Sequence, residues 1–153
     1  MTTTKTQLGT VEVLMTRDPV SVSGATTASE LAVILDENEI SGVPVVDLLE
    51  RVIGVVSRTD LLRRCVEGPL GSRPGSFLLS IAEGLGGQID TEMLGVVSEF
   101  MNPEPVTATP DEPASAVARR MMDERVHRAI IVDGENHLLG IVTSLDMVSL
   151  VAS

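Results

Sequence analysis

The sequence predicts an α/β (α+β) domain made of two pseudo-symmetric β-α-β-β-α units whose small sheets pack together. Three observations predict this fold. The first half of the chain recurs in the second half, each half reads as strand, helix, two strands and helix, and both halves end on the same strand-to-helix pattern. We assign residues 8–66 to the first repeat, 67–93 to a loop and helical linker, and 94–153 to the second repeat.

The repeat needs no gap in its alignment. A shift of 86 residues aligns 8–62 with 94–148, and 14 of these 55 positions are identical. Other pairs exchange similar residues, such as Leu35 with Met121 and Ile40 with Val126. Chance similarity in an apolar-rich chain does not give an ungapped alignment of this length, so the chain contains two copies of one structural unit.

Each unit contains the same series of predicted elements. A short leading segment, 11–15 or 97–101, precedes a proline-containing turn and a small strand, 20–23 or 106–109. Apolar residues at helical spacing then predict a helix from Ala28 to Ile40 and from Ala114 to Val126. Two β-branched runs follow, 43–46 and 52–56 or 129–132 and 138–142, and a closing helix begins near residue 59 or 145.

The linker between the repeats has no counterpart elsewhere in the chain. Glycine and proline mark residues 68–75 as a loop. Short helices are expected at Ser76–Gly84 and Asp90–Met101, the second capped by Asp90 or Thr91.

Composition limits the classes of function. Acidic residues outnumber basic ones by 22 to 11, which argues against a broad surface for nucleic acid or anionic membrane. No apolar run approaches a membrane span and residues 1–9 lack a signal-peptide core, so we expect a cytoplasmic protein. Cys65 is the only cysteine, which leaves no disulfide framework and no recognisable zinc site. Met121, Met122 and Met147 are expected to be packing or interface residues.

The shared ending of the two repeats is the main candidate for a binding site. It reads Gly, two apolar residues, a hydroxyl residue, two variable residues and Asp, at Gly54–Asp60 and Gly140–Asp146. A helix N-terminus offers N–H groups to a phosphate, and a nearby carboxylate can accept hydrogen bonds from sugar hydroxyls. The alternative is helix capping by Ser57 and Thr143, with the two acids in the first turns. The residues alone leave both interpretations open.

These motifs resemble the CBS domain, and two copies in one chain resemble the tandem CBS pair, or Bateman module, of bacterial stand-alone CBS domain proteins. The resemblance is carried by Met-Thr-Arg-Asp-Pro-Val at 15–20, Ser-Gly-Val-Pro-Val-Val-Asp at 41–47 and the two endings. Val-His-Arg-Ala-Ile-Ile-Val-Asp at 126–133 looks like the corresponding segment of nucleotide-sensing members such as the AMP-activated kinase regulatory subunit. The match covers about 110 residues. It implies packed β-α-β-β-α units, commonly assembled as a homodimer, that bind an adenosine-type ligand.

The resemblance also implies which residues form the site. The ribose acids would be Asp60 and Asp146, and the phosphate-side hydroxyls would be Ser57 and Thr143. The adenine pocket would be formed by the first strand and by the segment entering the second strand of each repeat. Those residues are Val22, Val43 and Pro44 in the first repeat, and Ala108, Ala129 and Ile130 in the second.

The two repeats differ in charge at this candidate site. His127 and Arg128 stand where the first repeat has an uncharged Ser-Gly pair, and Arg58 stands where the second repeat has a serine. If the ligand clefts are shared, Arg128 and Arg58 would reach one phosphate from opposite repeats. The alternative is that His127 and Arg128 are surface residues stabilised by the C-terminal dipole of the preceding helix.

The expected function is regulatory binding of AMP, ADP or ATP, with NAD(H) or S-adenosylmethionine as other adenosine-type ligands and no required cofactor. The chain would sense energy state or a metabolite, because a ligand that prefers one arrangement shifts the population toward it, and a separate effector protein or changed assembly would respond. No Ser/His/Asp or Cys/His arrangement stands at a recognisable motif, so we do not expect an enzyme. The alternative is a dimerisation or protein-interaction module that needs no ligand, which the acidic total favours.

Overall fold

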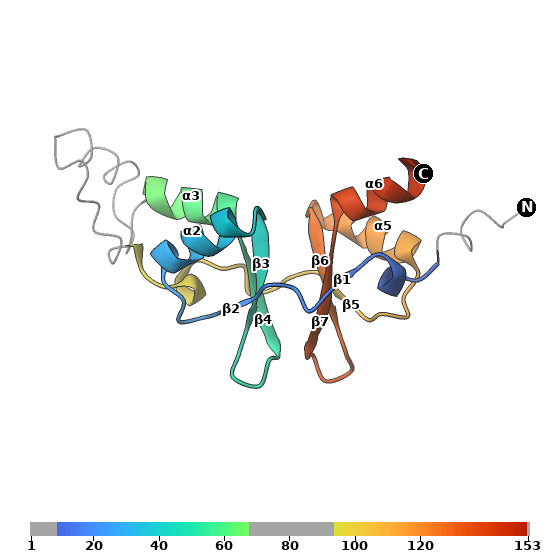
Figure 1. The fold of residues 1–153 in the computed structure, drawn as a ribbon, viewed down its shortest axis with the longest axis horizontal. Helices are drawn as coiled ribbons and strands as arrows, with labels where there is room; N and C mark the ends of the chain where they lie inside the picture. The colour runs from blue at the N-terminus through green and yellow to red at the C-terminus, as the bar shows by residue number, and fades with distance from the viewer. Residues whose placement is uncertain (1–8, 68–93, 153) are drawn as a thin grey trace, which may run out of the picture. The chain divides into compact units, whose positions relative to one another are not determined.

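A computed structural model describes residues 9–67 and 94–152 of the 153-residue chain (Figure 1). Residues 68–93 of the predicted linker, with the predicted helix Ser76–Gly84, lie outside the described residues. Within the described part, no helix is long and apolar enough to cross a membrane.

Both repeats contain the predicted series of strand, helix, two strands and helix. The first repeat contains the 3-10 helix η1 (Val11–Val13), β1 (Thr16–Arg17), β2 (Val22–Ser23), α2 (Ala28–Glu37), β3 (Gly42–Val46), β4 (Val52–Ser57) and α3 (Arg58–Glu67). The second repeat contains the 3-10 helix η5 (Val97–Glu99), β5 (Thr107–Ala108), α5 (Ala114–Glu124), β6 (Arg128–Val132), β7 (Leu138–Thr143) and α6 (Ser144–Ala152). The predicted mixed α/β fold is confirmed.

Two local predictions need correction. The two-residue strand β1 was not predicted, because so short a segment carries no alternation of apolar and polar residues. The predicted helix Asp90–Met101 is wrong in its described part, where Leu94 and η5 are 3-10 helical but Gly95 and Val96 are not helical. Gly95 has a φ of +80°, and Val96 forms an isolated antiparallel bridge with Thr27, so neither residue continues a helix.

The two long helices form for the reasons that the sequence indicated. Thr27 caps α2 in a reciprocal box: Glu30 N donates to Thr27 Oγ1 at 3.0 Å, and Thr27 N donates to Glu30 Oε1 at 2.9 Å. Residues at helical spacing face the core in both helices. The buried residues are Ala28, Leu31 and Leu35 on α2, and Ala114, Val117 and Met121 on α5.

The chain folds into two compact units that do not coincide with the repeats. One unit contains residues 9–20, 48–52 and 104–152 and has a four-stranded sheet in the order β1-β7-β6-β5. The other contains residues 21–47, 53–67 and 94–103 and has a three-stranded sheet in the order β2-β3-β4. In each unit two helices lie side by side along the sheet, α5 with α6 and α2 with α3 (Figure 1).

The leading segment of each repeat packs with the body of the other repeat. β1 pairs antiparallel with β7, and Thr16 lies opposite Ile141. Val11, fully buried, belongs to the apolar cluster of the second repeat with Val117 and Ile131. Val97 belongs to the cluster of the first repeat, whose other fully buried members include Leu31 and Val56. Each core is therefore completed by a segment from the other half of the chain.

Candidate ligand-binding site

The strand-to-helix junction of the second repeat holds Thr143 and Asp146 together. Thr143 ends β7, and Asp146 lies in the first turn of α6. Asp146 Oδ2 accepts hydrogen bonds from Thr143 N at 2.7 Å and from Thr143 Oγ1 at 3.0 Å. Asp146 N donates to Thr143 Oγ1 at 3.2 Å. The pair therefore forms a reciprocal helix cap, in which Asp146 Oδ2 accepts both hydrogen bonds that Thr143 donates.

The first repeat forms the same arrangement at the junction of β4 and α3. Asp60 Oδ2 accepts from Ser57 N at 2.8 Å and from Ser57 Oγ at 2.9 Å, and Asp60 N donates to Ser57 Oγ at 3.2 Å. The capping interpretation thus describes both copies. It does not conflict with ligand binding, because a carboxylate has two oxygens and about four acceptor sites.

The second oxygen distinguishes the two copies. Asp60 Oδ1 lies 3.5 Å from Arg63 Nη1, one helical turn further along α3. The residue equivalent to Arg63 in the second repeat is Ser149, whose hydroxyl donates to the backbone oxygen of Asp146 at 2.6 Å. This contact between Arg63 and Asp60 follows the i,i+3 spacing that brings side chains together on a helix.

Arg128 and Thr143 lie opposite each other on neighbouring strands. The Cα partners of the antiparallel pair β6–β7 include Arg128 with Thr143. His127, which is exposed, immediately precedes β6, and its carbonyl oxygen accepts from Ser144 N at 2.8 Å and Ser144 Oγ at 3.2 Å. The fold thus brings the basic pair of the second repeat to the junction that holds Thr143.

Arg58 is exposed at the start of α3, in the compact unit that contains the three-stranded sheet. Its backbone N donates to Ser41 O at 2.7 Å, and its Nη2 donates to Ile40 O at 3.3 Å. It therefore ties the start of α3 to the segment before β3, as Ser144 does for α6 and β6. Arg58 and Arg128 belong to different compact units, so their predicted contact with one shared phosphate stays a prediction.

The apolar residues of the predicted adenine pocket have buried side chains. Of these six, the first-repeat residues are Val22, Val43 and Pro44, and the second-repeat residues are Ala108, Ala129 and Ile130. Val22 and Val43 pack in the cluster of Leu31, and Ala108 and Ala129 pack in the cluster of Val117. In this structure these side chains are buried in the interior, and their predicted contact with an adenine ring stays a prediction.

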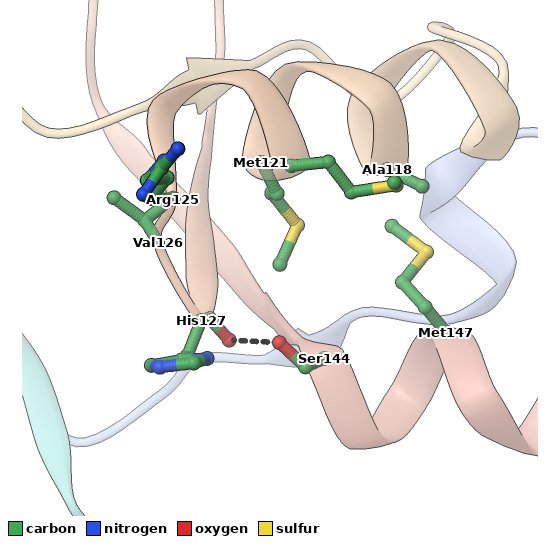
Figure 2. Close-up of a pocket in the computed structure, with 8 residues that line it drawn as sticks. Ala118, Met121, Arg125, Val126, His127, Ser144 and Met147 are labelled. Atoms are coloured by element: carbon green, nitrogen blue, oxygen red, sulfur yellow. Dashed lines mark hydrogen bonds between the residues drawn. The ribbon is translucent and has the colours of Figure 1, made fainter.

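A groove also runs between α5 and α6, and it reaches His127 and Ser144 beside the β7–α6 junction. Its larger part is a cavity of about 490 Å³ lined by Ala118, Met121, Met122, Arg125, Val126, His127, Ser144 and Met147. Figure 2 shows Met121 of α5 and Met147 of α6 directed into the space between the helices. The methionines are thus packing and surface residues, in line with their apolar spacing. Among the described residues, no group of three or more His, Cys, Asp or Glu could hold a metal ion.

Comparison with known proteins identifies the family. The family model of the CBS domain matches residues 11–67 and again 97–153. Inosine-5'-monophosphate dehydrogenase of Escherichia coli is 26% identical over 131 residues, which are 84% of this chain but 22% of that enzyme. The chain thus spans about a fifth of the length of that relative.

Solved structures of similar fold include small proteins of the same size. The structure of CBSX2 in complex with AMP has a TM-score of 0.72 and 25% identity, and it covers 94% of this chain and 96% of that one. CBSX2 from Arabidopsis thaliana is 26% identical in a second structure with a TM-score of 0.70, covering 94% of both chains. The CBS domain pair of protein MJ0100, in complex with 5'-methylthioadenosine and S-adenosyl-L-methionine, has a TM-score of 0.71, 22% identity and coverage of 95% and 97%.

The matched residues account for most of the chain and fall on both repeats. The match is also consistent with the duplicated strand-to-helix junctions and with the two small sheets. The chain belongs to the CBS domain family and carries a tandem pair of these domains.

Proposed function

We propose that this CBS pair is a regulatory module that binds an adenine nucleotide, AMP, ADP or ATP, and changes conformation or assembly in response. The observation that carries the proposal is the duplicated junction, in which a hydroxyl and a carboxylate lie within 3 Å of each other at a helix N-terminus. Such a junction offers acceptors to ribose hydroxyls and backbone N–H groups to a phosphate. The AMP complex of CBSX2, a similar protein, supports an adenosine-type ligand.

Charge favours the second repeat as the phosphate side. Arg128 lies in register with Thr143, and His127 precedes it, so two basic side chains accompany this junction. An arginine binds a phosphate through two parallel N–H donors, which gives a local anion site in a chain of net charge −11. Arg58 would supply a further cation from the first repeat.

The proposed mechanism is a population shift without catalysis. A nucleotide favours one arrangement of the chain only to the extent that it binds that arrangement more tightly. A separate effector protein, or a changed assembly of the chain, would respond to the shift. The match to inosine-5'-monophosphate dehydrogenase covers 22% of that enzyme, so it gives no ground for assigning its reaction to this chain.

Calorimetry tests the ligand class. Nucleotide-stripped protein is titrated with AMP, ADP, ATP, NAD and S-adenosylmethionine, and we expect saturable binding of at least one adenine nucleotide. A ligand at 100 times its dissociation constant should also raise the free energy of unfolding by about 2.7 kcal/mol. The proposal fails if none of the five ligands binds up to millimolar concentration.

A matched pair of variants separates ligand contact from helix capping. Asp146→Ala removes the reciprocal cap of α6, and Glu30→Ala removes the equivalent reciprocal cap of α2, where no ligand contact is proposed. Each change removes one half of a reciprocal cap, so both variants should be somewhat less stable than the wild type. We expect only Asp146→Ala to weaken nucleotide binding tenfold or more. Equal affinities of the two variants would assign Asp146 to capping alone.

The second candidate function is a ligand-independent dimerisation module. The observation that favours it is α6, which has no buried residue although it is mostly apolar, with Leu145 77% and Val151 81% exposed. A second copy of the chain would cover this helix in a homodimer. A protein that self-associates but whose melting does not respond to any of the five ligands would support this function over nucleotide binding.

A further inference from the structure

Ser144 connects the start of α6 to the segment that enters β6. Its backbone N donates to His127 O at 2.8 Å, and its Oγ donates to the same oxygen at 3.2 Å (Figure 2). The two residues are 17 positions apart in the chain, so the contact joins two elements and does not belong to the helix itself. A carbonyl oxygen has two lone pairs, and Ser144 supplies a donor to each. One residue therefore fixes the peptide group that joins His127 to Arg128.

The hydroxyl of Ser144 is not the cap of α6. That role belongs to Thr143, whose Oγ1 accepts from Asp146 N at 3.2 Å. Ser144 is the first residue of α6, and its hydroxyl donates out of the helix, to the carbonyl oxygen of His127. Removal of this hydroxyl thus leaves the cap of α6 in place and weakens only the connection between α6 and the entry to β6.

The first repeat has the same backbone connection but a different side-chain connection. At the equivalent positions, Arg58 N donates to Ser41 O at 2.7 Å. The guanidinium of Arg58 donates instead to Ile40 O at 3.3 Å, one residue earlier in the chain. The backbone hydrogen bond is therefore a property of the repeat. The second hydrogen bond to the carbonyl of His127 depends on the serine at position 144.

The segment that Ser144 holds carries the cations of the proposed phosphate side. His127 is exposed, and Arg128 is the half-buried first residue of β6. The end of α5 is closed by a hydrogen bond from Val126 N to Met121 O at 3.0 Å, so His127 lies beyond the last bond of that helix. The two hydrogen bonds from Ser144 thus orient the chain between the end of α5 and the start of β6.

We propose that Ser144 is a positioning residue of the second site, whose hydroxyl holds His127 and Arg128 in the orientation in which they meet the phosphate of the nucleotide. A charge-assisted hydrogen bond to a phosphate depends on direction as well as distance, so a rotated peptide group weakens it. The proposed ribose contact of Asp146 does not depend on the Ser144 hydroxyl, because Thr143 holds that carboxylate. This inference rests on the proposed nucleotide binding and deepens it.

Calorimetry with the adenine nucleotide that binds, and with adenosine, which has no phosphate, separates positioning from a general structural effect. Ser144→Ala should weaken nucleotide binding about fivefold, as expected for one net hydrogen bond, and adenosine binding by less than about twofold. Ser144→Thr keeps a hydroxyl donor and should return nucleotide binding to within about twofold of the wild type. Ser115→Ala makes the same chemical change at a half-buried serine of α5, outside the junction, and should alter neither affinity. Circular dichroism checks that every variant is folded.

A double-mutant cycle measures whether Ser144 acts through the basic residues. Arg128→Ala should weaken nucleotide binding, because it removes a proposed phosphate contact. In the Arg128→Ala background, Ser144→Ala should cost clearly less nucleotide affinity than it does in the wild type, since the group that it positions is gone. A loss as large as in the wild type would overturn the proposal, because Ser144 would then act on the ligand by another route.

The outcomes separate the possible failures. Wild-type protein that binds no adenine nucleotide contradicts the proposed function, and the positioning role falls with it. Wild-type binding that Ser144→Ala leaves unchanged overturns the positioning role only. Equal losses of nucleotide and adenosine affinity in Ser144→Ala also overturn it, because they would show a general change of the site and not the loss of a phosphate contact.

Discussion

Two glycines explain why the shared motif begins as it does. A Cβ on Gly140 would lie 2.7 Å from Met15 Sδ and 2.8 Å from Thr16 O. A Cβ on Gly54 would lie 2.6 Å from Met101 Sδ and 2.8 Å from the carbonyl oxygen of residue 102. The backbone of each leading segment crosses directly over the glycine of the other repeat. A side chain there would push the segment away, because a backbone oxygen cannot rotate aside.

We expect Gly140→Ala to lower the free energy of unfolding by about 1–3 kcal/mol, because overpacking forces the leading segment to shift. Gly134→Ala is the matched control, because a Cβ on Gly134 meets nothing within 4 Å. It should change stability by less than about 0.5 kcal/mol. Urea denaturation measures both variants. Equal effects would show that residues 15–16 move away from β7 at little cost.

Glu112 connects the loop before α5 to the helix itself. Arg120 Nη2 donates to Glu112 Oε1 at 2.6 Å, Arg120 Nη1 donates to Thr107 O at 2.7 Å, and Thr109 N donates to Glu112 Oε2 at 2.8 Å. The hydrogen bond from Arg120 lowers the pKa of Glu112 below its ordinary value of 4.5, against the opposing effect of burial. The charged form of this carboxyl is therefore favoured in the folded state.

Glu112→Gln should cost about 1 kcal/mol at pH 7, a modest value because both side chains are partly exposed. A lowered folded-state pKa gives stability that is complete above the unfolded pKa of about 4.5 and is lost as the pH falls through the folded value. The difference between variant and wild type should thus shrink below pH 4.5. Urea denaturation at pH 7 and pH 4 checks this, with Asp123→Asn on the same helix as control. A difference that is constant with pH would contradict the expectation.

At the scale of elements, each leading segment should stabilise the other repeat. Val11 is fully buried in the cluster of Val117 and Ile131, and Val97 is fully buried in the cluster of Leu31 and Val56. Secondary structure of both repeats thus depends on segments that are distant in sequence. A core substitution in a leading segment tests this dependence, because it should destabilise the repeat that the segment packs against.

We expect Val11→Ala to cost about 2 kcal/mol and to speed hydrogen exchange mainly in β6 and α5 of the second repeat. Val97→Ala should act mainly on β3 and α2 of the first repeat. The two variants make the same chemical change and serve as controls for each other. If each variant instead loosens its own repeat, or if both loosen the chain uniformly, the exchange of leading segments does not govern local stability.

At the scale of the whole molecule, the two candidate sites should be unequal. Asp60 Oδ1 lies beside Arg63, whereas Ser149 stands at that position beside Asp146. A ribose hydroxyl must compete with the guanidinium for Asp60. Binding through Asp146, with Arg128 in register with Thr143, should therefore be the tighter of the two.

Exchange of the equivalent residues tests this inequality. Arg63→Ser should strengthen the weaker site by up to about fivefold, as expected when an exposed ion pair of at most about 1 kcal/mol is removed. Ser149→Arg should weaken the tighter site by a similar factor. Two-site calorimetry with the nucleotide that binds measures both. Affinities that neither exchange alters would mean that Arg63 does not compete with the ligand.

The sequence by itself determined the features that depend on local pattern. The ungapped repeat predicted two like units, and apolar spacing predicted the buried face of α5 at Ala114, Val117 and Met121. The Thr143 and Asp146 junction was also visible, because a helix cap is made by residues three apart in the chain. These signals are local because helices, caps and hairpins are stabilised by near neighbours.

Only the tertiary structure decided which segments meet across the chain. The strand Thr16–Arg17 is too short to show a periodicity, and its partner β7 lies more than a hundred residues away, so no local pattern indicates the pair. The burial of Val43 and Pro44 likewise depends on what packs against β3. The groove between α5 and α6 is lined by side chains of both helices. The two helices meet only because they pack on the same sheet, so no local pattern in the sequence indicates the groove.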